Sequence, residues 1–156
     1  MTTQPLTRPI TREALLGTWS LQRTFELLDG QPTGRSPIGE KAHGFIHYMP
    51  GSRMSVMFAH EGHPRLSNGR YKSPDDETAR SSRTFCAYAG TFTIDGSDII
   101  HHLEISDFEN DRGTDYLRHA ALDGNSLTLV TPSWPTRRGE VAWGLEWHKL
   151  ESADNA

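Results

Sequence analysis

Apolar and polar residues alternate in short runs along most of this chain, with the period of two that is typical of β-strands rather than the longer period of helices. Turn-forming pairs such as Pro50-Gly51 and Asp123-Gly124 separate most of these runs. Consecutive strands joined by short turns are typical of an antiparallel meander. The alternation predicts eight strands, at residues 18–27, 42–49, 53–60, 88–94, 99–108, 114–122, 126–131 and 141–150.

Two segments depart from this alternation and predict helices. Residues 11–16 suit a single helical turn. The connection 61–87 suits a longer helix, because Ser73 can cap it, Pro74 fits the first helical position and three acidic residues follow in the first turn.

A flat eight-stranded sheet would expose two long edges, which closure removes. We therefore predict an all-β fold, an eight-stranded antiparallel β-barrel with one short helix between strands 3 and 4 as a lid or plug.

Length and composition narrow the class of protein. A chain of 156 residues suits one domain, and we expect an N-terminal tail at 1–13, the barrel domain at 14–150 and a C-terminal tail at 151–156. The net charge is −4 and no basic run is present, which argues against a nucleic-acid partner. Neither a signal-peptide core nor a bilayer-spanning stretch is visible, so we expect a cytoplasmic protein with no membrane partner.

Cysteine and histidine usage gives no metal or cofactor site. Cys86 is the only cysteine, which excludes an intrachain disulfide. His43 and His47 share a strand face opposite the apolar set, while His60 and His63 could meet at the barrel mouth. Because no compact ligand set results, we expect no metal and no cofactor. A haem held by one histidine is the remaining alternative.

The most informative stretch is the hairpin formed by the fifth and sixth predicted strands. Pairing them through the polar loop 109–113 places Glu104 opposite Arg118 and puts His102 on the same inward face. Charged groups on an apolar face are costly unless they are paired or used, so this face predicts an internal pocket with a polar patch. A one-residue slip would turn His101 inward instead.

The other inward positions predict a wide, mostly apolar and aromatic interior, which suits a hydrophobic ligand with one polar or anionic end. Tyrosine hydroxyls could donate to a ligand carbonyl, although wall packing is the alternative. Arg23 could clamp the ligand or be an outward charge. The predicted ligand-binding residues are Trp19, Arg23, Tyr48, Met54, Phe58, Tyr88, Phe92, Tyr116, Leu129, Trp143 and Trp147.

Several motifs resemble one known family. Gly17-Thr18-Trp19 opens the first strand, the hairpin GFIHYMPGSRM follows, and HHLE with a downstream arginine is the most specific part. Over about residues 14–150 the chain resembles the bacterial and fungal lipocalin-like domain proteins. The resemblance implies a lipocalin-like β-barrel that binds a small molecule. Similar folds include passive carriers and cofactor-free enzymes of secondary metabolism, such as cyclases and isomerases.

The function predicted from these residues is that of a cofactor-independent acid–base enzyme, an isomerase, cyclase or elimination catalyst, acting on a mostly apolar secondary metabolite. His102 and Glu104 would move protons, and Arg118 would stabilise oxyanion charge. The alternative is a non-catalytic carrier or sensor in which the same residues anchor the ligand. A third hypothesis is a structural barrel whose Glu104–Arg118 pair only sets register. Exposed strand edges or barrel ends could also pair two copies into a homodimer.

Overall fold

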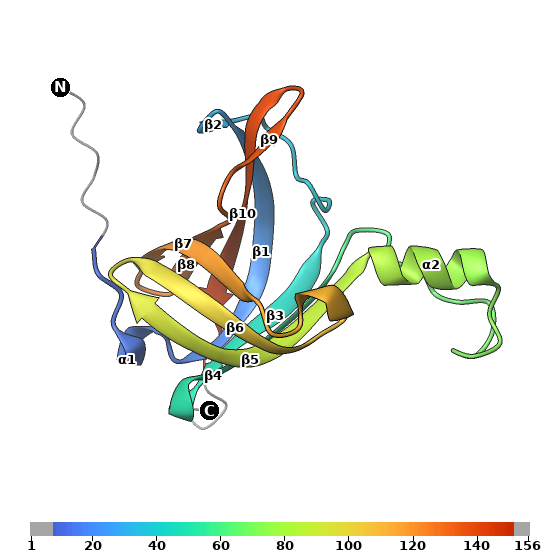
Figure 1. The fold of residues 1–156 in the computed structure, drawn as a ribbon, viewed down its shortest axis with the longest axis horizontal. Helices are drawn as coiled ribbons and strands as arrows, with labels where there is room; N and C mark the ends of the chain where they lie inside the picture. The colour runs from blue at the N-terminus through green and yellow to red at the C-terminus, as the bar shows by residue number, and fades with distance from the viewer. Residues whose placement is uncertain (1–7, 152–156) are drawn as a thin grey trace.

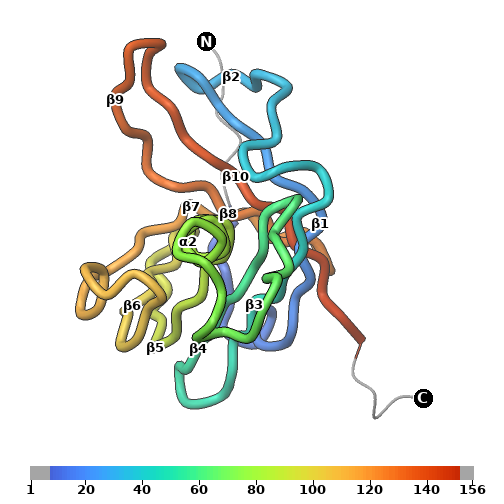
Figure 2. Tube along the Cα trace, turned by 90° about the vertical axis from the view of Figure 1, so that its right-hand side faces the viewer, coloured from blue at the N-terminus to red at the C-terminus, as the bar shows by residue number. Residues whose placement is uncertain are grey.

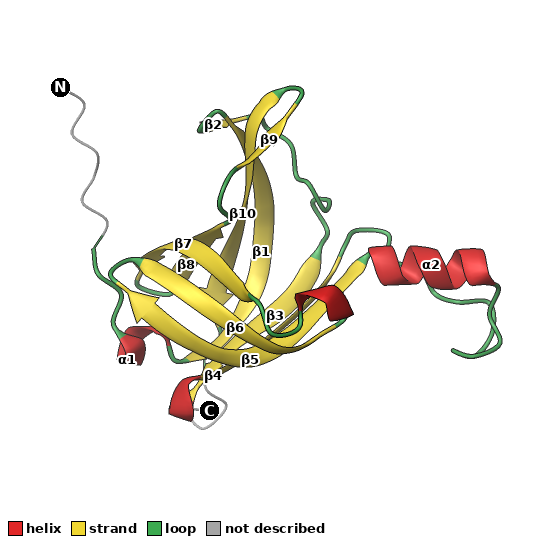
Figure 3. Cartoon of the chain, in the orientation of Figure 1, coloured by secondary structure: helices red, strands yellow, loops and turns green. Residues whose placement is uncertain are grey.

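The computed structural model describes residues 8–151, which form a β-barrel with two α-helices and two short 3₁₀ turns (Figure 3). Residues 1–7 and 152–156 of the predicted tails lie outside the described range. The helices are α1 (Arg12–Leu15) and α2 (Asp75–Arg83), and the 3₁₀ turns are η1 (Pro50–Ser52) and η2 (Glu109–Asp111). The strands are β1 (Gly17–Leu28), β2 (Gln31–Pro32), β3 (His43–Met49), β4 (Arg53–Ala59), β5 (Phe85–Asp95), β6 (Asp98–Ser106), β7 (Asp115–Asp123), β8 (Ser126–Val130), β9 (Trp134–Thr136) and β10 (Gly139–Lys149).

Eight of these strands close into an antiparallel barrel in the order β1-β3-β4-β5-β6-β7-β8-β10, because β1 pairs with both β3 and β10. The predicted barrel is confirmed, and closure removes the exposed edges. The two additional strands, β2 and β9, pair with the far ends of β1 and β10. They extend this long two-stranded ribbon beyond the barrel (Figure 1).

The two ends of the barrel differ. At one end α1 packs inward, with Leu15 fully buried and its carbonyl accepting a 2.9 Å hydrogen bond from Trp19 Nε1. Ile10, in the predicted tail, is also buried, and its amide donates to the Gly96 carbonyl at 2.9 Å. At the other end α2, between the third and fourth barrel strands as predicted, buries no residue and projects outward (Figures 1 and 2). The inner plug is therefore α1, and α2 borders the open end. Neither described helix is long and apolar enough to cross a membrane.

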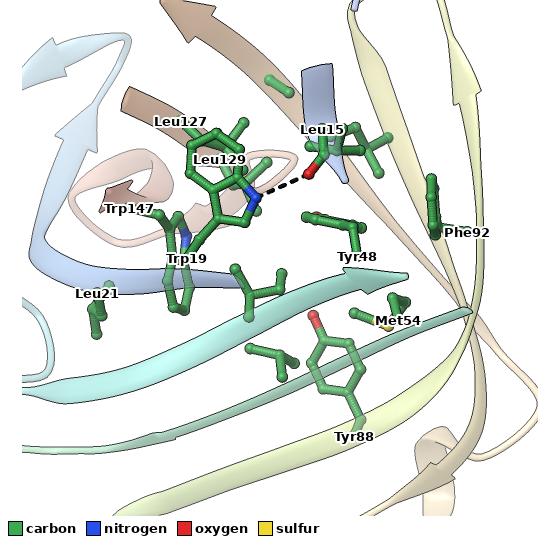
Figure 4. Close-up of a cluster of buried hydrophobic side chains, with 14 of the residues drawn as sticks. Leu15, Trp19, Leu21, Tyr48, Met54, Tyr88, Phe92, Leu127, Leu129 and Trp147 are labelled. Carbon is green, nitrogen blue, oxygen red and sulfur yellow. Dashed lines mark hydrogen bonds between the residues drawn. The ribbon is translucent and has the colours of Figure 1, made fainter. Parts of the chain in front are cut away.

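Large aromatic and aliphatic side chains of the core cluster next to Leu15 of α1 (Figure 4). The rings of Tyr48 and Phe92 pack edge to face with their centres 5.0 Å apart. Full burial of one such side chain contributes roughly 1.5–3 kcal/mol. Trp19, Met54 and Phe92, predicted as ligand contacts, belong to this packed floor.

The predicted register between the fifth and sixth predicted strands is wrong by an odd number of residues. In the structure Ile99 pairs with Arg118 and His101 with Tyr116, so Ile99, His101 and Leu103 face the interior. His101 is fully buried, whereas the side chain of Glu104 is 53 % exposed. The predicted inward placement of His102 and Glu104 is thereby corrected: both lie on the outside of the barrel.

The cause is a longer connection between β6 and β7 than the sequence pattern suggested. Asp107 does not continue β6: its amide donates to the Ala87 carbonyl at 2.8 Å, and its carboxylate accepts from the Ala87 amide at 3.1 Å. The turn η2 then occupies part of the connection. An irregularity between Ala89 and Gly90 also interrupts the β5–β6 register opposite Glu104. The hydrogen bonds of Asp107 to Ala87 and the turn η2 therefore replace the tight hairpin that the sequence pattern suggested.

A second bulge changes the face of β1. The register with β10 shifts between Leu21 and Arg23, so that Thr24 becomes an inward residue. Of the two alternatives for Arg23, a ligand clamp or an outward charge, the structure shows the outward charge for this reason. Its guanidinium lies outside the barrel, with Nε 2.6 Å from the Glu146 carboxylate and 5.1 Å between its Cζ and the centre of the Phe25 ring.

Candidate ligand-binding site

Two neighbouring cavities lie between the open end of the barrel and the core. The inner cavity has a volume of about 120 Å³ and the mouth cavity about 310 Å³. They share the walls formed by Phe58, Cys86, Trp143 and Leu145. The inner cavity is further lined by Ile46, Val56, Tyr88, Tyr116, Arg118, Leu129, Thr131 and Trp147. The mouth cavity is further lined by Thr24, Pro37, Ile38, His60, Ser82, Arg83, Phe85 and Asp107.

The structure brings only part of the predicted site together. The predicted ligand contacts that line the inner cavity are Phe58, Tyr88, Tyr116, Leu129, Trp143 and Trp147. Arg118, predicted as catalytic, lies in the same wall. Tyr48 is buried behind this wall and reaches it through His101, a residue that the predicted register had turned outward. The inner cavity therefore combines apolar walls with a single cationic group.

Arg118 has no counterion. Its Nη1 donates to the Leu117 carbonyl at 2.8 Å, and its Cζ lies 4.9 Å from the centre of the Tyr116 ring. Within residues 8–151 no carboxylate forms an ion pair with it. A guanidinium among apolar walls is costly unless an anion or a polar oxygen compensates it. The cavity is thus suited to a ligand that carries such a group.

Behind Arg118, a buried histidine joins two tyrosines. His101 Nε2 lies 2.8 Å from Tyr48 Oη, and His101 Nδ1 lies 3.0 Å from Tyr88 Oη. Burial, followed by the positive charge of Arg118, lowers the pKa of His101 to about 3, so the imidazole is neutral at physiological pH. Burial also raises the pKa of Tyr88 to about 12, and Arg118 opposes that rise. These three side chains are therefore uncharged hydrogen-bonding groups.

Three further polar atoms near the cavities lack partners. Trp147 Nε1, Trp143 Nε1 and Thr24 Oγ1 are buried without a hydrogen bond in the described chain. All three residues line the inner or the mouth cavity. Leaving a buried donor unsatisfied costs roughly 1–3 kcal/mol. Oxygen atoms of a bound molecule would offset that cost if they reached these groups.

The two outward residues of the predicted catalytic set are engaged on the barrel surface. His102 Nδ1 lies 2.7 Å from the Asp115 carboxylate, and its Nε2 lies 3.0 Å from Thr93 Oγ1. Glu104 forms a two-pronged pair with Arg53, whose hydrogen bonds lower the pKa of this carboxyl. The barrel wall separates both groups from the cavities. Among residues 8–151, no group of three or more His, Cys, Asp or Glu side chains is placed to hold a metal ion.

A closed eight-stranded barrel, filled at one end by a helical turn and hollow towards the other, defines the class of small barrels that enclose small molecules. Residues 16–150 match the family model described as a lipocalin-like domain. The chain therefore belongs to the lipocalin-like domain family. Comparisons with curated proteins and with solved structures found no match.

Proposed function

We propose that the protein binds a mostly apolar small molecule whose anionic or carbonyl oxygen is held by Arg118. The observation that carries this proposal is the unpaired guanidinium in the wall of an apolar cavity. A charged hydrogen bond to this group would contribute more than a neutral one, because Arg118 is partly buried and so partly shielded from water. The apolar walls would supply the remaining affinity.

Cavity size limits how the molecule would lie. A cavity of about 150 Å³ is enough for benzene. The inner cavity, at about 120 Å³, would therefore take the polar head of the ligand and a part of it about as large as one small ring. The rest would extend past Cys86 and Trp143 into the larger mouth cavity.

Acid–base isomerisation or cyclisation of the same ligand is a second candidate function, and it needs a proton acceptor near the ligand. Burial raises the pKa values of Cys86, Tyr88 and Tyr116, so these groups stay protonated at neutral pH. The catalytic hypothesis is better supported at the mouth. There burial lowers the pKa of His60, which favours the neutral imidazole that can accept a proton, and Asp107 lines the same cavity. His60 would then take the role first given to His102.

Two dyes with a common aromatic skeleton test the binding proposal. Anilinonaphthalene sulfonate carries an anionic group that N-phenylnaphthylamine lacks. Arg118→Met keeps most of the side-chain volume and removes the charge, so it should weaken binding of the sulfonate by about tenfold or more, since hydrogen bonds to charged groups contribute roughly 1.5–3 kcal/mol. Binding of the neutral dye should change by less than about twofold. Fluorescence titration measures both affinities.

Arg23→Met is the matched control, because its guanidinium lies outside the barrel and should not affect either dye. Equal affinity of the sulfonate for wild type and Arg118→Met would contradict the proposed anchor. Loss of both dyes in Arg118→Met would indicate collapse of the cavity, which circular dichroism and a melting curve would reveal.

A further inference from the structure

The surroundings of the Tyr48–His101–Tyr88 chain favour one direction for its two hydrogen bonds. A neutral imidazole donates from one ring nitrogen and accepts at the other. Since His101 contacts one tyrosine hydroxyl through each nitrogen, one tyrosine gives it a hydrogen bond and the other receives one. Which tyrosine donates decides what each hydroxyl can offer to a ligand.

Tyr48 must be the donor. It is 1 % exposed, and within the described chain its hydroxyl contacts only His101 Nε2. If Nε2 carried the proton, the Tyr48 hydroxyl hydrogen would have no acceptor in the core, and buried polar groups are rarely left in that state. Tyr48 therefore donates to Nε2, and the imidazole proton lies on Nδ1.

This tautomer leaves the hydroxyl hydrogen of Tyr88 free. His101 Nδ1 donates to Tyr88 Oη at 3.0 Å, and no other acceptor for the Tyr88 hydroxyl hydrogen is found among residues 8–151. Arg118 lies beside it but carries only donors, so it cannot accept this hydrogen. A free O–H and an unpaired guanidinium thus lie together in the wall of the inner cavity.

We propose that Tyr88 and Arg118 together bind one oxygen group of the ligand, and that this group is acceptor-only: a carboxylate, a sulfonate, a carbonyl or an enolate. A ligand ammonium in the same place would meet two donors, and the hydrogen of a ligand hydroxyl would find no acceptor there, so we expect both to bind more weakly. His101 and Tyr48 are positioning residues that hold the Tyr88 hydroxyl in its donating state. The inference rests on the proposed function and adds the chemical class of the head group.

The same chain cannot pass a net proton to the ligand. A proton moving from Tyr88 would have to be replaced through His101 from Tyr48, which would leave a phenolate at a fully buried site. Burial raises the pKa of Tyr48 well above its ordinary value, so that state is strongly disfavoured. The role of Tyr88 is therefore to donate a hydrogen bond and not to act as a general acid.

The first test needs no ligand. Long-range ¹H–¹⁵N correlation spectra of histidine-labelled protein report which ring nitrogen carries the proton, and the His101→Phe spectrum identifies the His101 signals. We expect His101 to be protonated on Nδ1 at neutral pH. Protonation on Nε2 would overturn the inference whatever the binding data show.

The second test uses Tyr88→Phe and the two dyes. Loss of one hydrogen bond to an anion should weaken binding of anilinonaphthalene sulfonate by about tenfold, while N-phenylnaphthylamine should change by less than about twofold. Tyr71→Phe, the same change at a 94 % exposed side chain, is the control. Sulfonate affinity that falls in Arg118→Met but not in Tyr88→Phe would overturn this inference and leave the proposed function standing. Affinity unchanged by Arg118→Met would overturn the proposed function itself.

Discussion

The neutral state of His101 links one side chain to the stability of the whole barrel. Its pKa is about 3 in the folded protein, and an unfolded histidine has a pKa near 6.5. Between these values the unfolded chain binds a proton that the folded chain does not. Stability from this group is therefore complete above about pH 6.5 and is lost as the pH falls towards 3.

His101→Phe tests this linkage. At pH 7 the variant should be less stable by about 2–4 kcal/mol, because two buried tyrosine hydroxyls lose their partner. At pH 5 the difference from wild type should shrink by about 2 kcal/mol, since only wild type must keep a histidine unprotonated. Urea unfolding at the two pH values measures the difference. If the stability difference between wild type and His101→Phe were the same at both pH values, this would contradict a buried, neutral His101.

The residues around His101 indicated that its side chain faces inward, but the predicted hairpin register placed it on the outside. Ile99 and Leu103 flank His101 at alternate positions and both are buried, whereas Glu104 and Ile105 beyond them are exposed. The more apolar of the two alternating sets was therefore the inward one. Arg118 was placed on the correct face because its own strand gave a clear pattern with Ala120 and Leu122. No property of His101 alone reveals that two tyrosines from other strands meet it.

At the level of strands, the parity of a register error decides its effect on the site. A two-residue turn at Asp123-Gly124, as the sequence pattern suggests, would place Arg118 opposite Leu129, whereas Ala120 is the observed partner of Leu129. This shift of two residues leaves the same side chains inward, because side chains alternate with a period of two. The odd shift between β6 and β7 exchanges the two faces and moves His102 and Glu104 outside.

The irregularity between β5 and β6 depends on a glycine and gives a prediction at this scale. A Cβ on Gly90 would lie 1.8 Å from the His102 carbonyl oxygen, which belongs to the neighbouring backbone and cannot move aside. Gly90→Ala should cost at least about 2–3 kcal/mol of unfolding free energy through overpacking and strain. Gly69→Ala, where a Cβ meets nothing within 4 Å, should stay within about 0.5 kcal/mol of wild type. Comparable chemical denaturation midpoints for both variants would contradict this account.

On the scale of the whole molecule, the barrel has a packed end beneath α1 and a hollow end beside α2. Between them, Cys86 lies in the wall shared by the mouth and inner cavities. Burial raises the pKa of this thiol to about 12, well above its ordinary value. The rate at which Cys86 is alkylated can therefore report whether the inner and mouth cavities are occupied.

We expect iodoacetamide to modify Cys86 at least about a hundredfold more slowly than glutathione at pH 8, because only the thiolate reacts. Saturating anilinonaphthalene sulfonate should slow the reaction by about tenfold more, since the dye would cover the shared wall. In Arg118→Met the same dye concentration should protect less. Mass spectrometry measures the alkylation rate, and a rate unaffected by the dye in wild type would contradict binding within the barrel.

The sequence by itself determined the class of fold. Period-two alternation and turn pairs are local signals, and each of the eight barrel strands could be recognised from residues within a few positions of it. The same signals identified much of the inner wall, including Arg118, Tyr88 and Trp147. Family membership rests on these local patterns too.

Only the tertiary structure decided which polar groups face the ligand. The bulges in β1 and between β5 and β6 depend on backbone hydrogen bonds to other strands, and they exclude Arg23 and Glu104 from the interior. The contacts of His101 join residues 53 and 13 positions away along the chain. Such long-range pairing has no local signature, because it arises from strand register around a closed barrel.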